Sequence, residues 1–177
     1  YKQTYFQINV CLKALKKIAS TGVQVIITYP NNDIGGKLII KEIIKCKKQK
    51  NIFVFKSLGS KIYHGILSLN TKGKNIVCAG NSSSGIKETP VFGCPTLNIG
   101  PRQQNRMRGE NVIDSDYNSN EIYSKLSKCL YNKSFKNRCK ASKNPYGGGN
   151  SGNKIVAYLS NLKASKEKIL IKKQQIK

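Results

Sequence analysis

The sequence lacks several features that mark common functional classes. It has a single histidine, and none of its cysteines forms a CxxC pair. This composition excludes a zinc site of the usual ligand spacing and gives no support to a Ser/His/Asp or Cys/His nucleophile. The longest apolar runs, such as residues 23–28, are too short to span a bilayer. We therefore expect no metal, no cofactor and no membrane partner.

An initiator methionine and a signal-peptide pattern are also missing, because the sequence opens YKQTYFQ. We expect the chain to be a piece of a longer, cytoplasmic protein. The cysteines fit this location, since most fall on apolar faces, where they would be reduced core thiols. They are Cys11, Cys46, Cys78, Cys94, Cys129 and Cys139.

Acidic residues are few: 8 against 32 basic residues, for a net charge of +24. Such a charge suggests nucleic-acid binding. However, only four of the basic residues are arginine, and the lysines are scattered over predicted helix faces rather than gathered beside aromatics. A biased base composition, which favours lysine, isoleucine and asparagine, explains this pattern without a ligand. We expect weak polyanion binding at low salt and no specific nucleic-acid partner.

Two kinds of apolar segment alternate along the chain, about every 20–25 residues. Helical spacing predicts helices over 4–19, 37–49, 61–69, 118–132 and 153–162. β-Branched apolar runs predict strands over 23–29, 51–55, 75–80, 95–100 and 111–114, the first of them fully buried. This alternation is typical of an α/β fold, a Rossmann-like parallel sheet flanked by helices. We expect one domain over residues 1–162 and a basic tail over 163–177.

The loop GNSSSGIKE follows the third predicted strand. Parallel sheets bind ligands beyond the carboxyl ends of their strands. Here Ser82, Ser83 and Ser84 would present hydroxyl and backbone N–H groups at a helix N-terminus, a geometry that binds phosphate. Glu88, one turn later, could accept two hydrogen bonds from ribose hydroxyls. The simpler alternative is that a serine only caps the helix.

Three of the four arginines, Arg102, Arg106 and Arg108, cluster in PRQQNRMRGENV after the fourth predicted strand. In a chain that otherwise uses lysine, this cluster suggests a guanidinium clamp for a diphosphate. The alternative is a surface loop with chance arginines.

Two further features have plain structural explanations. In YPNNDIGG, Asn31, Asn32 and Asp33 follow the end of the first predicted strand, on the same sheet edge, where an Asx-type turn would also explain them. His64, the only histidine, lies in a predicted helix and is interpreted as a surface or half-buried structural residue.

A series of motifs resembles the C-terminal half of hydrolysing UDP-N-acetylglucosamine 2-epimerases. In chain order they are YPNNDIGG, FKSLG, GNSSSGIKE, PTLNIG, RQ followed by NVID, and YGGGNSG. The resemblance covers residues 23–162. A departure is the polar KGKN before the third predicted strand, where relatives are more apolar. The resemblance implies the C-terminal domain of a GT-B (UDP-glycosyltransferase/glycogen phosphorylase-like) enzyme, with a UDP-sugar in the cleft between two Rossmann-like domains.

The resemblance also implies roles for individual residues. Ser82 and Ser83 would bind the diphosphate, Glu88 the ribose and Arg102 the UDP moiety. Asn31 and Asp33 would line the sugar side. The secondary candidates for UDP binding are Asn81, Ser84, Gly85 and Arg106.

The reaction implied by the resemblance eliminates UDP and adds water, giving N-acetylmannosamine for sialic-acid-type sugars, or acts on a diacetamido sugar. The acid/base carboxylates and a conserved histidine would lie outside this chain, so no catalytic residue is assigned within it. We therefore expect weak UDP binding, no turnover alone, and a need for the N-terminal domain or a partner chain. The chain would be a truncation, a split gene product or a remnant, and a homodimer is left open.

Two other functions remain alternatives. A GT-B glycosyltransferase would use the same loops to bind a nucleotide-sugar donor. A non-enzymatic basic binding protein would instead hold DNA at physiological salt.

Overall fold

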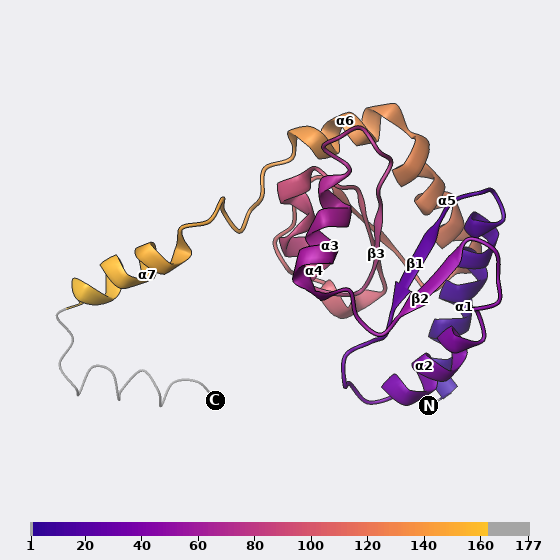
Figure 1. Cartoon of the computed structure of the whole chain (residues 1–177). Helices are drawn as coiled ribbons and strands as arrows, with labels where there is room; N and C mark the ends of the chain where they lie inside the picture. The colour runs from indigo at the N-terminus through magenta and orange to yellow at the C-terminus, as the bar shows by residue number, and fades with distance from the viewer. Residues whose placement is uncertain (1, 163–177) are drawn as a thin grey trace. The chain divides into compact units, whose positions relative to one another are not determined.

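The computed structural model describes residues 2–162, so the predicted basic tail over 163–177 lies outside the described residues. Two units are distinguished, Tyr1–Tyr146 and Gly147–Lys177. The strands are β1 (Val25–Thr28), β2 (Ile52–Phe55), β3 (Cys78–Gly80), β4 (Thr96–Ile99) and β5 (Val112–Ser115). The helices are α1 (Lys2–Ala19), α2 (Gly36–Ile44), α3 (Gly59–Ser68), α4 (Ser84–Lys87), α5 (Ser119–Tyr131), α6 (Lys133–Ala141) and α7 (Ser151–Ser160), with 3-10 turns η1 (Thr89–Phe92) and η2 (Pro101–Gln103) (Figure 1).

All strand pairings within residues 2–162 are parallel, which confirms the predicted α/β fold with parallel strands and flanking helices. The strands form two sheets, β1-β2 and β3-β4-β5, rather than one. β3 has only three residues, and residues 75–77, predicted as part of this strand, lie outside it. The chain turns over residues 72–74 just before them, with Gly73 at φ 82°, next to the point where a longer strand would have begun.

The prediction that the first strand is buried on both faces is wrong. β1 alternates, with Val25 buried and Ile26 44% exposed, and β2 alternates in step. This is the pattern of a sheet covered on one face only. The central strand β4, by contrast, is buried along its whole length.

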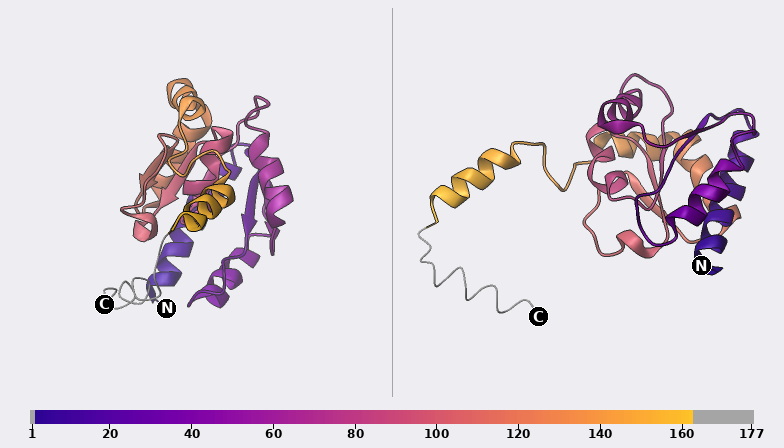
Figure 2. Two further views of the ribbon diagram at one scale, coloured as in Figure 1. Left: turned by 90° about the vertical axis from the view of Figure 1, so that its left-hand side faces the viewer. Right: turned by 60° about the horizontal axis from the view of Figure 1, so that its bottom comes forward.

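The core of the first unit joins α1, β4 and α5. The helix α1 packs against both α5 and α2, and the views in Figures 1 and 2 show it beside them. The buried residues of this core include Leu12, Ile18, Leu97, Ile122, Leu126 and Phe135. The second unit contains the helix α7, none of whose residues is buried.

The helix α6 was not among the predicted helices, because its sequence KSFKNRCKA is mostly polar. It begins at the cap Asn132, whose side chain accepts a hydrogen bond from the N–H of Phe135. Only Phe135 and Cys139 are buried, and their spacing of four residues is the one sequence signal for this helix.

All six cysteines are free thiols, as predicted, and four of them are fully buried. Burial raises the pKa of Cys129 to about 12 and that of Cys139 to about 11. These two cysteines are therefore packing residues rather than reactive thiolates. In the part of the chain that the structure describes, no helix combines the length and hydropathy that crossing a bilayer requires.

Candidate functional site

The loops after β1 and β4 meet through a long-range ion pair. Arg102 follows β4 in η2, and its Nη2 donates to Oδ2 of Asp33 in the loop after β1, at 3.1 Å. The two residues are 69 positions apart, so the predicted placement of both loops at one edge is supported by this contact. Both side chains are at least half exposed, which leaves the guanidinium accessible to a ligand.

The loops after β3 and β4 are joined by Gln103, whose Nε2 donates to the backbone oxygen of Asn81 at 2.8 Å. Gln103 is buried, 3% exposed, and its Oε1 has no hydrogen-bond partner among the described residues. The sequence alone does not single out Gln103, and its only signal is its place beside Arg102 in the RQQ run.

The arginine cluster divides into two kinds of residue. Arg108 is held within the protein, because its guanidinium donates to Asp114 in β5 and, at 2.9 Å, to the backbone oxygen of Gln103 in its own loop. Arg102 and Arg106 are exposed. Two of the three guanidinium groups are therefore available to an anion, and the third shapes the loop that carries them.

The serine loop leaves β3 at Gly80, which has φ 143°. Ser82 Oγ accepts a hydrogen bond from the N–H of Ser84 at 3.3 Å, which leaves its own O–H free to donate. Ser83 is the N-cap of α4, but its side chain makes no capping bond. The simple capping explanation therefore does not account for Ser83.

The rest of this loop is packed against the protein. Ser84 Oγ donates to Oη of Tyr63 at 2.6 Å, so this hydroxyl is already engaged. Gly85 is buried, and a Cβ on it would lie 3.2 Å from Thr96 Cγ2. α4 has only four residues, and the N–H groups of Ser84 and Gly85 already donate to Ser82. The loop therefore offers an anion the hydroxyls of Ser82 and Ser83 rather than a long helix dipole.

Glu88, at the end of α4, has a partner that the sequence did not indicate. Its Oε2 lies 2.6 Å from Nε2 of His64 in α3, and both side chains are a little under half exposed. His64 is therefore exposed, as predicted, but it belongs to the same cluster as the carboxylate predicted to bind ribose.

The loop after β1 makes a tight turn in which the N–H of Gly36 donates to the backbone oxygen of Asp33 at 2.9 Å. The side chain of Asp33 bonds to Arg102 rather than to its own backbone, so the alternative of an Asx-type turn does not account for Asp33. Asn31 and Asn32 are exposed in the same loop.

Gly100 and Tyr117 make a close contact beside the candidate site. Gly100, between β4 and η2, has φ 78°, and a Cβ on it would lie 2.5 Å from the ring of Tyr117. Burial raises the pKa of Tyr117, and a hydrogen bond with the Asn81 side chain opposes that rise. Tyr117 therefore contacts both the serine loop, at Asn81, and the start of the arginine loop, at Gly100.

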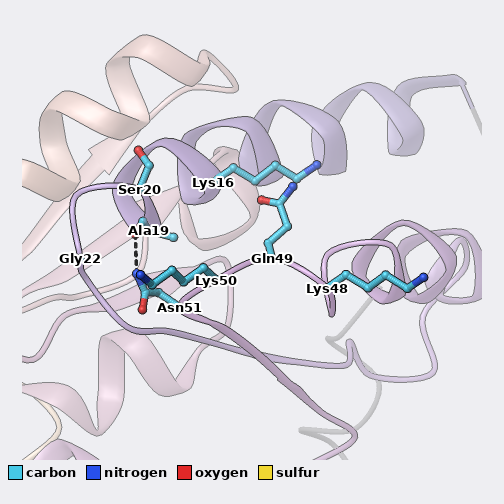
Figure 3. Close-up of a pocket in the computed structure, with 8 residues that line it drawn as sticks. All are labelled: Lys16, Ala19, Ser20, Gly22, Lys48, Gln49, Lys50 and Asn51. Carbon is cyan, nitrogen blue, oxygen red and sulfur yellow. Dashed lines mark hydrogen bonds between the residues drawn. The ribbon is translucent and has the colours of Figure 1, made fainter.

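A separate open pocket lies at the other end of β1 and β2, before Val25 and Ile52. Three lysines contribute to its lining, Lys16, Lys48 and Lys50, and Figure 3 shows the side chain of Gln49 pointing toward that of Lys16. It contains none of the predicted site residues, which are at the carboxyl ends of the strands.

Comparison of the sequence with known proteins identifies relatives of this chain. The family model described as UDP-N-acetylglucosamine 2-epimerase matches residues 3–160. The chain is 37% identical over 108 residues to UDP-N-acetylglucosamine 2-epimerase of Neisseria meningitidis, covering 61% of this chain and 27% of the relative.

Two hydrolysing epimerases are also similar. The GDP/UDP-N,N'-diacetylbacillosamine 2-epimerase of Campylobacter jejuni is 40% identical over 71% of this chain and 32% of its own length. The UDP-N,N'-diacetylbacillosamine 2-epimerase of Legionella pneumophila is 32% identical over 81% of this chain and 35% of its own length. The chain thus spans about a third of these relatives. With the match to the family model over nearly its whole length, the chain belongs to the UDP-N-acetylglucosamine 2-epimerase family.

Proposed function

We propose that this chain is the UDP-binding half of a hydrolysing UDP-N-acetylglucosamine 2-epimerase. The observation that carries the proposal is the convergence of three loops. Gln103 ties the arginine loop to Asn81 of the serine loop, and Arg102 ties it to Asp33. The exposed guanidinium of Arg102 and the hydroxyls of Ser82 and Ser83 thereby lie on connected loops. Together these groups could bind a diphosphate.

The remaining contacts follow from this placement of the diphosphate. Glu88 would accept hydrogen bonds from the ribose hydroxyls, with Ser84 and Gly85 holding the loop that carries it. Asn31 and Asp33 would face the sugar, and Arg106 would add positive charge. When the diphosphate binds, Arg102 would exchange its contact with Asp33 for contacts with the phosphate oxygens. Breaking the Arg102–Asp33 ion pair would cost little free energy, because the pair is exposed.

In the proposed reaction a base removes the proton at C2, and the bond from C1 to the diphosphate oxygen breaks with its electron pair leaving on UDP. Water then adds across the double bond of the glycal, giving N-acetylmannosamine, a precursor for sialic-acid-type sugars. This chain's part is to stabilise the charge that develops on the departing diphosphate. The acid and base would come from an N-terminal domain or a partner chain.

The proposed setting is the cytoplasm, where the six free thiols would stay reduced. The proposed partners are a UDP-sugar and a polypeptide that supplies the other half of the cleft. A second copy of this chain is a further candidate partner.

The proposal is tested by mixing the chain with the N-terminal half of the Neisseria meningitidis relative and UDP-N-acetylglucosamine, with no acceptor. We expect free N-acetylmannosamine and UDP from the mixture and no turnover from either half alone. The chain with a Ser82→Ala, Ser83→Ala double substitution serves as the matched control and should lose activity in the mixture. Transfer of the sugar to an added acceptor, without free N-acetylmannosamine, would instead indicate a glycosyltransferase.

A further inference from the structure

The only histidine of the chain lies beside the carboxylate assigned to ribose. His64 Nε2 and Glu88 Oε2 are 2.6 Å apart, although 24 residues separate them in sequence. A carboxylate at this distance accepts a hydrogen bond, so Nε2 carries the proton and donates it. One oxygen of Glu88 is therefore engaged by the protein, and Oε1 remains available.

The imidazole is held in place by aromatic rings. Its ring centroid lies 5.6 Å from that of Tyr63 and 5.8 Å from that of Phe92 in η1. These are distances at which aromatic rings interact favourably. Tyr63 is itself fixed by the hydrogen bond from Ser84 Oγ. The orientation of His64 is thus coupled to the serine loop through two contacts.

The hydrogen bond from His64 restricts the Glu88 side chain. A glutamate that is nearly half exposed samples several rotamers, and ordering it on binding costs conformational entropy. A donor that already holds one carboxylate oxygen restricts those rotamers before the ligand arrives, which favours binding. Each carboxylate oxygen has two lone pairs, so a bond from His64 still leaves acceptor sites for two ribose hydroxyls.

We propose that His64 is a positioning residue that orients Glu88 for the ribose hydroxyls of the nucleotide. The proposal rests on the proposed function, because it takes Glu88 as the ribose-binding carboxylate. This role differs from the interpretation of His64 as a structural surface residue. It predicts that loss of His64 affects binding of the ribose and leaves binding of the diphosphate unchanged.

The test compares UDP, 2'-deoxy-UDP and inorganic pyrophosphate on the full chain and on two variants, by calorimetry or ligand-observed NMR. His64→Leu removes the donor, and His64→Gln retains an amide N–H that can reach the carboxylate. We expect His64→Leu to weaken UDP binding about three- to tenfold, as for the loss of one hydrogen bond. Pyrophosphate binding should be unchanged, and 2'-deoxy-UDP should lose less than UDP.

His64→Gln should restore most of the UDP affinity, which a merely structural role would not predict. The positioning role is overturned if His64→Leu weakens UDP and pyrophosphate equally, if it leaves UDP binding unchanged, or if it strengthens it. In the last case His64 would be a competitor for the carboxylate. Absence of UDP binding by the unmodified chain would instead overturn the proposed function, and the positioning role with it.

Discussion

Replacing Arg102 with alanine is expected to lower the affinity of the chain for UDP about 10- to 100-fold, as for the loss of hydrogen bonds to a charged group. The guanidinium is exposed at the junction of two loops, where it can reach a diphosphate. Arg102→Lys should recover only a small part of the affinity, because an ammonium group lacks the planar fork that bonds two phosphate oxygens. Calorimetric titration of each variant with UDP measures both effects.

The matched control for Arg102 is Lys50→Ala, which removes one positive charge at the opposite end of the strands. It should leave UDP affinity unchanged. The fold should survive the loss of Arg102, because the exposed pair with Asp33 contributes about 1 kcal/mol or less. Equal weakening by Lys50→Ala and Arg102→Ala would mean that UDP responds only to the net charge of the chain.

Replacing Gly100 with alanine is expected to destabilise the fold by about 2–4 kcal/mol. Two causes act together. The backbone has φ 78°, a conformation that is unfavourable for residues with a Cβ, and that Cβ would lie 2.5 Å from the Tyr117 ring. Relief of the clash would move Tyr117 away from its hydrogen bond with the Asn81 side chain, so UDP binding should weaken as well. Urea unfolding measures the first effect, and calorimetry at a temperature where the variant is folded measures the second.

Gly65→Ala is the control for this substitution. Gly65 lies inside α3, and a Cβ there would contact nothing within 4 Å. Alanine should leave the free energy of unfolding unchanged or raise it by about 0.5–1 kcal/mol, since it favours the helix. If Gly100→Ala were as stable as Gly65→Ala, the close contact between Gly100 and Tyr117 would be wrong.

The fold class follows from local sequence patterns. Short β-branched runs such as VQVIITY and NIFVF alternate with amphipathic segments, and this periodicity is sufficient for a parallel α/β fold. The split into two sheets could not be predicted in this way, because local periodicity does not say which strands pair. The helix α6 was missed because only Phe135 and Cys139 mark its buried face.

The site shows a similar division. The positions of its loops follow from strand ends, since the carboxyl ends of parallel strands carry the ligand-binding loops. The contacts among them do not, because nothing in the spacing pairs His64 with Glu88 or Gln103 with Asn81. Such pairings depend on side-chain directions in the folded chain, and the same holds for the use of Arg108 within its own loop.

The most direct test is titration of UDP into isotope-labelled chain, followed residue by residue through the backbone amide signals. Binding as proposed would shift residues 81–88 and 100–106 together, with the loop around Asp33 following as its contact with Arg102 is exchanged. The proposal would be contradicted if saturating UDP left both loops unshifted, or if the shifts centred on the lysines at the amino ends of β1 and β2.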